Sequence, residues 1–182
     1  MLVFAKFTKP TAAVLWSRVA TIAMHEGKPM LMIRMANARG NRIVEATVSL
    51  TAALSGTTKE GETFRKLHDM HLVRRTSPIF SLSFTAMHVL DATSPLHGET
   101  EESLREKGLE IITMLSGLDE TSGQTVHART SYAAEDLRFG QRFVDVIQVE
   151  ADGKRVINYT LFHDTKPSPL PAEISAALTP SA

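Results

Sequence analysis

The feature that most limits what this chain can fold into is an alternation of polar and apolar residues with a period of two. In Asn41–Leu50, the residues after Val44 fall into a polar set and an apolar set: Glu45, Thr47 and Ser49 against Ala46, Val48 and Leu50. Ile79–Leu90 alternates in the same way, with Phe80, Leu82, Phe84 and Ala86 opposite Ser81, Ser83 and Thr85. Successive side chains of a strand point to opposite faces of its sheet, so this spacing predicts strands with one buried face.

Shorter patterns extend this prediction in both directions. Met30–Ala36 is an apolar run broken only by Arg34, and the turn residues of Asn37–Asn41 follow it, which predicts a hairpin with the next strand. Thr57–Phe64 is polar and predicts a loop.

The second half of the chain carries one helix signal. Thr100 can cap a helix, acidic residues fill its first turn and Gly108 can end it, which predicts a short helix over about Thr100–Lys107. Leu109–Leu115 predicts the next strand. Gln141–His163 predicts a hairpin whose tight turn takes its positive φ angles from Asp152-Gly153.

Length and composition fit one globular domain. The 182 residues suffice for a single core, and 20 basic residues balance 20 acidic ones, so bulk attraction to nucleic acid is not expected. The absence of cysteine excludes disulfides and thiolate metal sites. No apolar run approaches the roughly 18–20 residues that span a bilayer. Several short strands, one helix and long connections predict an all-β, immunoglobulin-like sandwich.

Catalytic motifs are missing from the sequence. It contains no G-x-S-x-G elbow, Walker loop, H-E-x-x-H or G-x-G-x-x-G. His68 and His71 could occupy neighbouring helical positions with Asp69 between them, but without a clear third ligand they are weak evidence for a metal site. His88 falls on the apolar side of its segment, which favours a hydrogen-bonded core residue. We therefore expect neither an enzyme nor a metal site.

Six segments, in order, carry a resemblance to a known family: FAKFTKPTA, GKPMLMIRMANARGNRIVEATV, GETFRKLHDMHLVRRTSPIFSLSFTAMHVLD, SPLHG, SGLDETSGQTVHARTSY and EDLRFGQRFVDV. Together they cover about residues 4–165 and resemble the cytoplasmic domain of inward-rectifier potassium channels, most closely the prokaryotic KirBac-type members. The two membrane helices and the TVGYG-type filter of that family do not occur in this sequence.

The resemblance implies a role for the polar side of Asn41–Leu50. In the family, four immunoglobulin-like (E-set) sandwiches surround an axis that extends the transmembrane pore, and the acidic residue of a VEA motif lines this vestibule. Glu45 matches that acid, and Thr47 and Ser49 would share its wall, along which K⁺ passes and in which Mg²⁺ or polyamine can lodge. From the residues alone, Glu45 is an ordinary exposed strand residue.

Ser116–Thr125 matches the G-loop of the family, a girdle at the membrane-facing end of the cytoplasmic pore that can narrow to a gate. Gly117 and Gly123 would permit close approach of four backbones, and Leu118 stands where a large apolar residue constricts the passage. Gln124 replaces a second apolar girdle residue of eukaryotic members. A mobile hairpin loop between two strands is the local alternative.

Five basic residues match membrane-proximal positions of the family: Lys6, Lys9, Arg39, Arg42 and Arg129. The resemblance implies contact with anionic lipid headgroups, each worth roughly 1 kcal/mol. For Arg129, an ion pair within or between subunits is an equal alternative. Leu72 and Thr76 fall where strong rectifiers carry further pore acids, which predicts weaker trapping of Mg²⁺ and polyamines.

The combined prediction is a pore-extension and gating domain with one or two short helices and no cofactor. We expect a connector from the membrane inner helix at 1–23, the sandwich at 24–165 and a flexible tail at 166–182. The expected partners are three further copies in a homotetramer, the transmembrane pore domain and anionic lipid, at the cytoplasmic face of the cell membrane. The alternative is a soluble immunoglobulin-like module that binds another protein.

Overall fold

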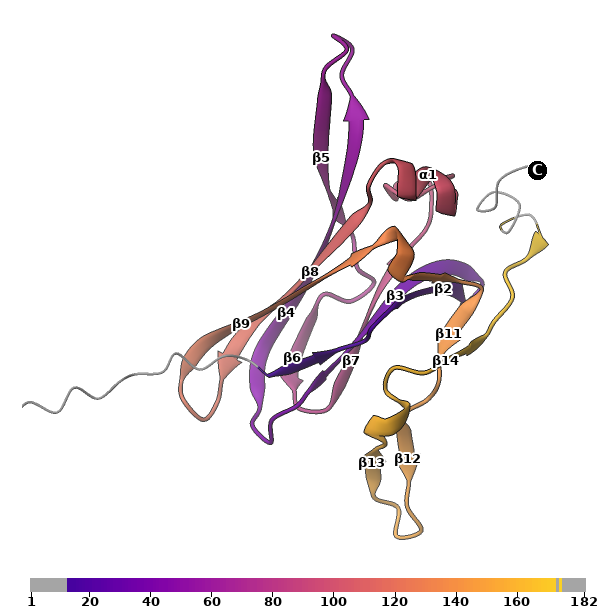
Figure 1. Cartoon of the computed structure of the whole chain (residues 1–182). Coiled ribbons are helices and arrows are strands. Elements are labelled where there is room, and N and C mark those ends of the chain that lie inside the picture. Colours follow the sequence, from indigo (N-terminus) through magenta and orange to yellow (C-terminus); the bar gives the residue numbers. More distant parts are fainter. Residues whose placement is uncertain (1–12, 173, 175–182) are drawn as a thin grey trace, which may run out of the picture.

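Two β-sheets packed face to face form the body of the computed structural model, which describes residues 13–172 and 174 (Figure 1). Sheet A is built around β3 (Lys28–Asn37). β7 (Ser83–Val89) pairs with one edge of β3, while β1 (Val14–Trp16) and β2 (Ala20–His25) follow each other along the other edge. β10 (Leu137–Phe139) completes the sheet and runs parallel to β2.

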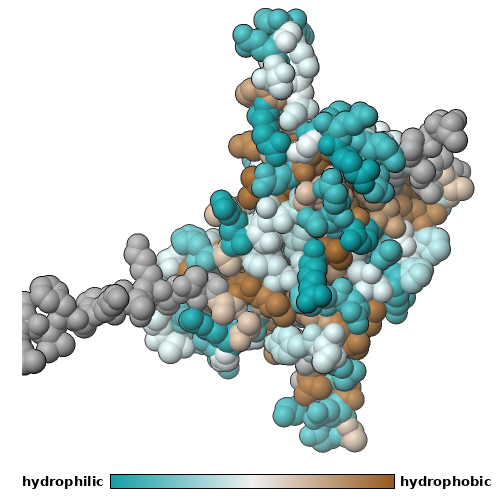
Figure 2. Space-filling view, viewed as in Figure 1, coloured by the Kyte–Doolittle hydropathy of each residue, from teal (hydrophilic) through white to brown (hydrophobic). Residues whose placement is uncertain are grey.

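Sheet B has the same plan around β4 (Ile43–Thr57). β8 (Glu110–Asp119) pairs with one edge of β4, and β6 (Thr76–Phe80) and β5 (Thr63–Met70) follow each other along the other edge. β9 (Gln124–Ala133) pairs with the outer edge of β8. Past Ala53, β4 has only β5 as a partner, so the β4–β5 hairpin projects from the body (Figure 1). Figure 2 shows that the tip of this hairpin is largely hydrophilic.

One helix and two small ribbons complete the described chain. α1 (Glu101–Glu106) begins at the N-cap Thr100, whose hydroxyl accepts a hydrogen bond from Ser103 N at 3.1 Å, and Gly108 follows it with φ +57°. The remaining elements are η1 (Ala134–Asp136), β11 (Gln141–Phe143), β12 (Ile147–Val149), β13 (Arg155–Ile157), η2 (Tyr159–Leu161) and β14 (Thr165–Pro167). β11 pairs with β14, and β12 pairs with β13.

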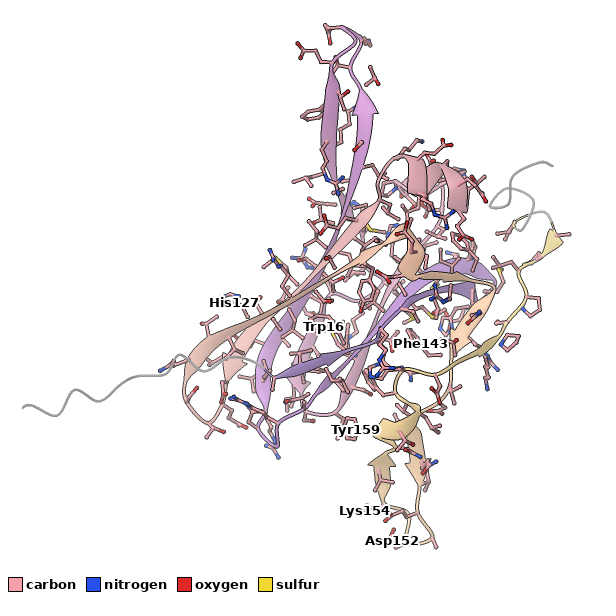
Figure 3. The ribbon with its side chains drawn as sticks, in the orientation of Figure 1. Trp16, His127, Phe143, Asp152, Lys154 and Tyr159 are labelled. Atoms are coloured by element: carbon pink, nitrogen blue, oxygen red, sulfur yellow. The ribbon has the colours of Figure 1, made fainter. Side chains whose placement is uncertain are left out.

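The two sheets differ in how their outer faces are covered. The core between them is formed by large buried side chains from both, among them Ile33, Leu50 and Ile111. The outer face of sheet A is also buried, because the segment from β11 to β14 packs Phe143 (Figure 3) against it. Phe162 of the same segment packs against Ala36 of β3. No described segment covers the outer face of sheet B in the same way, where Ser49, Met114 and Arg129 are exposed.

Arg34 explains the polar residue within the apolar run of β3. It lies on the outer face of sheet A and is only 7 % exposed, and its guanidinium donates to the carbonyl oxygens of Val144 at 2.6 Å and Phe162 at 3.4 Å. The same group lies 4.5 Å from the centre of the Phe143 ring. Burial lowers the pKa of this guanidinium. Arg34 therefore attaches the C-terminal segment to sheet A.

The predicted fold class is confirmed, but one predicted hairpin is wrong. The Asn37–Asn41 turn does not join paired strands, because β3 belongs to sheet A and β4 to sheet B. The turn instead crosses between the sheets, and the buried Asn37 side chain donates to the carbonyl oxygens of Asn41 and Phe80 at 2.8 and 3.2 Å. Alternation predicts a strand but does not say which sheet the strand joins.

The predicted single strand Ile79–Leu90 is also wrong, because it is two strands in different sheets. β6 ends at Phe80, β7 begins at Ser83, and Leu82 between them is 51 % exposed at the crossing. His88 in β7 is 3 % exposed and hydrogen-bonded at both ring nitrogens, to the His71 carbonyl oxygen and the Ser94 hydroxyl, each at 2.8 Å. The interpretation of His88 as a satisfied core residue is therefore confirmed.

The other predicted elements are found with altered ends. The helix is confirmed, and the strand predicted at Leu109–Leu115 extends to Asp119. Strands occupy part of the predicted loop, so the turn covers only 58–62. The C-terminal hairpin is limited to β12 and β13, and only Gly153 of the expected Asp152-Gly153 pair has a positive φ, +81°.

The segment expected before the sandwich contributes strands to sheet A, and the expected tail contributes a strand to a small ribbon. Val14–Trp16 and the first residues of β2, expected in the connector, are paired in sheet A, and Lys166–Pro167, expected in the tail, are paired with β11. Lys6 and Lys9 lie outside the described residues.

Candidate functional site

A β-bulge interrupts β4 at Glu45. Val44 pairs with Leu118 and Thr47 pairs with Ser116, so both Glu45 and Ala46 lie opposite Gly117. Glu45 has a φ of +52°, a left-handed conformation that costs a non-glycine residue roughly 1–2 kcal/mol. Bulges of this kind redirect a side chain at the edge of a regular ladder. Here the bulge determines where the Glu45 carboxylate points.

Gly117 fits against this bulge at a distance that leaves no room for a side chain. A Cβ atom at position 117 would lie 2.5 Å from Ile43 Cγ2, 3.1 Å from the Val44 carbonyl oxygen and 3.2 Å from Ala46 Cα. Gly117 therefore lies within a paired strand and allows close packing inside one chain.

Burial confirms the alternation of polar and apolar residues along Glu45–Leu50. Glu45 and Ser49 are exposed and Thr47 is half-buried, whereas Ala46, Val48 and Leu50 are buried. No described segment crosses over the exposed side, which is the outer face of sheet B. The three predicted wall residues thus share one open surface.

Cross-strand neighbours extend this surface over the whole sheet. Thr47 pairs with Ser116, which pairs with His127, and Ser49 pairs with Met114, which pairs with Arg129. Figure 3 shows His127 on the outer side of β9. On the other edge, Thr51 pairs with Asp69 and its hydroxyl donates to the Asp69 carboxylate at 3.5 Å. We call this set of outward residues the sheet B wall.

One end of the wall is apolar. Ile79, Val44 and Leu118 are cross-strand neighbours on β6, β4 and β8, and Ile79 and Leu118 are 52 % and 37 % exposed. The Leu118 side chain is therefore part of an apolar row that also contains Val44 and Ile79, neither of which was predicted from sequence.

The segment Ser116–Thr125 is a strand–turn–strand hairpin. Gly117 and Leu118 lie in β8, Gly123 lies in the turn with φ +64°, and Gln124 begins β9. The Asp119 carboxylate accepts hydrogen bonds from the backbone N–H groups of Thr121 and Ser122 at 2.9 and 3.2 Å and from the Asn41 side chain at 2.7 Å. These bonds, chiefly the Ser122 one, lower the pKa of Asp119.

The predicted basic residues separate into two groups. Arg39 and Arg42 lie between β3 and β4, beside the β8–β9 turn, where Arg42 approaches Glu120 at 3.8 Å and its carbonyl oxygen accepts from Glu120 N at 3.0 Å. Arg129 lies elsewhere, exposed in β9 on the sheet B wall. In the described part of the chain it has no carboxylate within 4.0 Å, so no ion pair within one copy accounts for it.

Three polar residues line a recess beside Ser49 that was not predicted from sequence. Asp69, His71 and Arg75 line a recess of about 260 Å³ together with Ser49. The sequence allows helical positions for His68 and His71, but Asp69 lies in strand β5, where His68 and Asp69 point to opposite faces. Among the described residues, no three histidine or acidic side chains form a group that could hold a metal ion. The turn around Gly61, flanked by two extended runs, was the available signal for a hairpin.

None of the described helices is long and apolar enough to cross a membrane.

Comparisons with known proteins agree on one family. The model for the inward rectifier potassium channel C-terminal domain matches residues 14–180. Inward rectifier potassium channel Kirbac3.1 from Paramagnetospirillum magnetotacticum is 45% identical over 163 residues, which cover 90% of this chain and 55% of the relative. Human G protein-activated inward rectifier potassium channel 1 is 34% identical over 176 residues, covering 92% of this chain and 35% of the relative.

The chain thus spans about half the length of Kirbac3.1 and about a third of the human channel. Among solved structures, the sporulation control protein Spo0M from Bacillus subtilis aligns with 70% of this chain and 49% of its own, at 10% identity and a TM-score of 0.35, which is too low to support a conclusion.

Proposed function

The chain belongs to the inward rectifier potassium channel C-terminal domain family, and we propose that four copies surround an axis with their sheet B walls lining a cytoplasmic extension of the pore. The family is a channel domain and not an enzyme family. The transmembrane pore, the K⁺ that passes through it and the cytoplasmic face of the cell membrane enter this proposal through the resemblance to the longer relatives.

The observation that carries the proposal is the difference between the two outer faces. The C-terminal segment buries the outer face of sheet A, including the side chain of Arg34. The outer face of sheet B is left open by every described segment and carries Glu45, Thr47 and Ser49. Small hydroxyls hydrate cations without filling a narrow passage, and a carboxylate raises the local cation concentration.

The left-handed conformation of Glu45 supports a role for this carboxylate. Residues held in such conformations cluster at functional sites, where the surrounding structure compensates for the strain. Gly117 and the bulge hold Glu45 beside the apolar row of Val44, Ile79 and Leu118. In a ring of four, an acidic zone would then follow directly after an apolar constriction.

The packing of Gly117 also suggests how such a constriction moves. Leu118 follows a glycine that is packed against the β4 backbone, so it cannot swing as a free loop residue. We infer that the apolar row opens when whole domains rotate, as in other rigid-body switches, with local adjustment confined to the turn around Gly123. Gln124, the first residue of β9, borders that turn.

The end of the domain that holds the β8–β9 turn is proposed to face the membrane. Arg39 and Arg42 lie at this end, and Lys6 and Lys9 precede the described chain. These cations would contact anionic headgroups, whereas Arg129 belongs to the wall and is removed from the lipid set. Mg²⁺ and polyamines remain candidate occupants of the vestibule.

Spin labels can test the ring and its orientation together, because the chain has no cysteine of its own. Ser49→Cys places a label on the wall, and Lys28→Cys places a matched label at the start of β3, in the other sheet. In a fourfold ring, pulsed-dipolar spectroscopy should give two distances in a ratio of about 1.4, the diagonal to the side of a square. Both distances should be shorter for Ser49→Cys than for Lys28→Cys.

The result that contradicts the proposal is equally specific. Longer distances for Ser49→Cys than for Lys28→Cys would place the wall on the outside of the ring. A stable monomer at high concentration would favour the alternative, a soluble immunoglobulin-like binding module.

A further inference from the structure

His163 lies among the contacts that attach the C-terminal segment, β11 to β14, to sheet A (Figure 1). The preceding residue, Phe162, is fully buried, and its carbonyl oxygen accepts a hydrogen bond from the Arg34 guanidinium at 3.4 Å. The carbonyl oxygen of the following residue, Asp164, accepts from Val144 N at 3.0 Å. A change in the charge of His163 therefore acts directly on the attachment of this segment.

The Nδ1 atom of His163 is buried and has no hydrogen-bond partner among the described residues. The side chain as a whole is half-buried and lies edge-on to the Phe162 ring, with 5.3 Å between the ring centres and 88° between the ring planes. A neutral imidazole fits this environment with its proton on Nε2, which leaves only a lone pair at Nδ1. A protonated imidazole must place an N–H group at Nδ1 as well, and a buried donor without an acceptor is destabilising.

The charges around His163 also disfavour a positive ring. Arg18, between β1 and β2, contributes a positive charge from the body of the domain, and Asp164 of the C-terminal segment opposes it. On the side of β3, Arg34 is a further buried guanidinium, whose charge the Asp145 carboxylate partly offsets. Burial, and after it the charge of Arg18, keeps the pKa of His163 below its ordinary value of 6.5.

We propose that His163 makes the attachment of the C-terminal segment to sheet A sensitive to pH, with the segment held while the ring is neutral and released when Nδ1 takes up a proton. The protonated ring can donate from Nδ1 to water only if the segment moves away from sheet A. Since the released ring binds a proton more readily than the attached ring, release should increase as the pH falls below about 6.5. This inference does not rest on the proposed ring of four copies, because every group involved belongs to one copy.

Hydrogen exchange of the backbone amides, followed by mass spectrometry on the full chain between pH 8 and pH 5, tests the proposal. Each exchange rate is divided by the intrinsic rate at the same pH, and the protection of 143–162 is compared with that of β8. A loss of stability of the whole domain changes both regions, whereas release of the segment changes only the first. The variants are His163→Gln and Arg18→Gln, and His97→Gln is the matched control at an exposed histidine.

We expect the protection of 143–162, relative to that of β8, to fall at least about fivefold between pH 8 and pH 5, the smallest effect expected from a buried donor without an acceptor. The control His97→Gln should show the same fall. His163→Gln, which is neutral at every pH used, should lose most of it. Arg18→Gln should make the fall smaller, because without that charge the attached ring resists protonation less.

Two results would overturn the proposal: protection of 143–162 that changes with pH no more than that of β8, and a fall that persists unchanged in His163→Gln. Neither result bears on the ring of four copies, which sedimentation and the spin-label distances test separately. Should His163→Gln not fold, NMR titration of the unmodified chain decides the matter. The His163 ring must then titrate at a lower pH than the exposed His97 ring, and equal midpoints would contradict the proposal.

Discussion

Replacing Gly117 by alanine should destabilise the domain much more than a single methyl group would suggest. The added Cβ would lie 2.5 Å from Ile43 Cγ2, and Ile43 is 1 % exposed in the core. Two backbone atoms of β4, the Val44 carbonyl oxygen and Ala46 Cα, would lie at 3.1 and 3.2 Å. Relief therefore requires a shift of the β4 backbone at the bulge, because a rotamer change of Ile43 alone leaves the backbone contacts in place.

The expected size follows from similar overpacked cores, where such changes cost about 1–3 kcal/mol. We expect the upper half, about 2–3 kcal/mol, because two of the three contacts are to backbone. For a domain of this length, that corresponds to a fall in Tm of roughly 4–12 °C. Displacing the bulge also moves Glu45, so cation binding to the wall should weaken together with stability.

Urea unfolding monitored by tryptophan fluorescence measures this, since Trp16 is the one tryptophan of the chain. Gly56→Ala is the matched control: Gly56 is also in β4, has no positive φ, and an added Cβ would have no heavy atom within 4 Å. There the substitution should be neutral or stabilising by up to about 1 kcal/mol. Equal unfolding free energies for the two alanine variants would refute the packing argument.

Three further outcomes follow from particular contacts. Glu45→Gly should stabilise the domain by roughly 0.5–1 kcal/mol, because glycine adopts a positive φ without strain. The control Ser49→Gly, in the regular part of β4, should destabilise the domain by about as much. A lower free energy of unfolding in both variants would show that Glu45 is not strained. Burial lowers the pKa of His88, so the unfolded chain binds a proton at this site more readily than the folded chain does. The free energy of unfolding should therefore fall as the pH drops below about 6.5. The fall should be as large in the control His97→Gln, at an exposed site, and smaller in His88→Gln. Arg34→Met should leave the Val144 carbonyl oxygen without its donor and speed hydrogen exchange across 143–162, while exchange in β8 stays unchanged.

Local chemistry made part of the fold predictable. The alternation of Thr47 and Ser49 with Val48 and Leu50 depends only on consecutive residues, and it holds in the structure. The cap at Thr100 is equally local, since the capping hydroxyl and its partner Ser103 are three residues apart. The family was identifiable for a different reason: six segments in a fixed order carry more information than any one of them.

Contacts between residues far apart in the sequence could not be predicted from these local patterns. Alternation could not show that β6 and β7 join different sheets, because a strand has the same period whichever partner it pairs with. Nothing local excludes helical positions for His68 and His71, and only the pairing of β5 with β4 makes the segment a strand. Arg34 interrupts its run for a reason that lies more than a hundred residues away, at Val144 and Phe162.

The amino-acid sequence by itself determined that this chain is a β-sandwich of a channel family, with a polar strand face beginning at Glu45. Only the tertiary structure decided that Glu45 sits on a bulge fitted against Gly117, and that Arg129 shares its open face. The physical reason is that periodicity and capping act between near neighbours in the chain, whereas the charge of a surface is the sum over whichever strands long-range packing brings side by side.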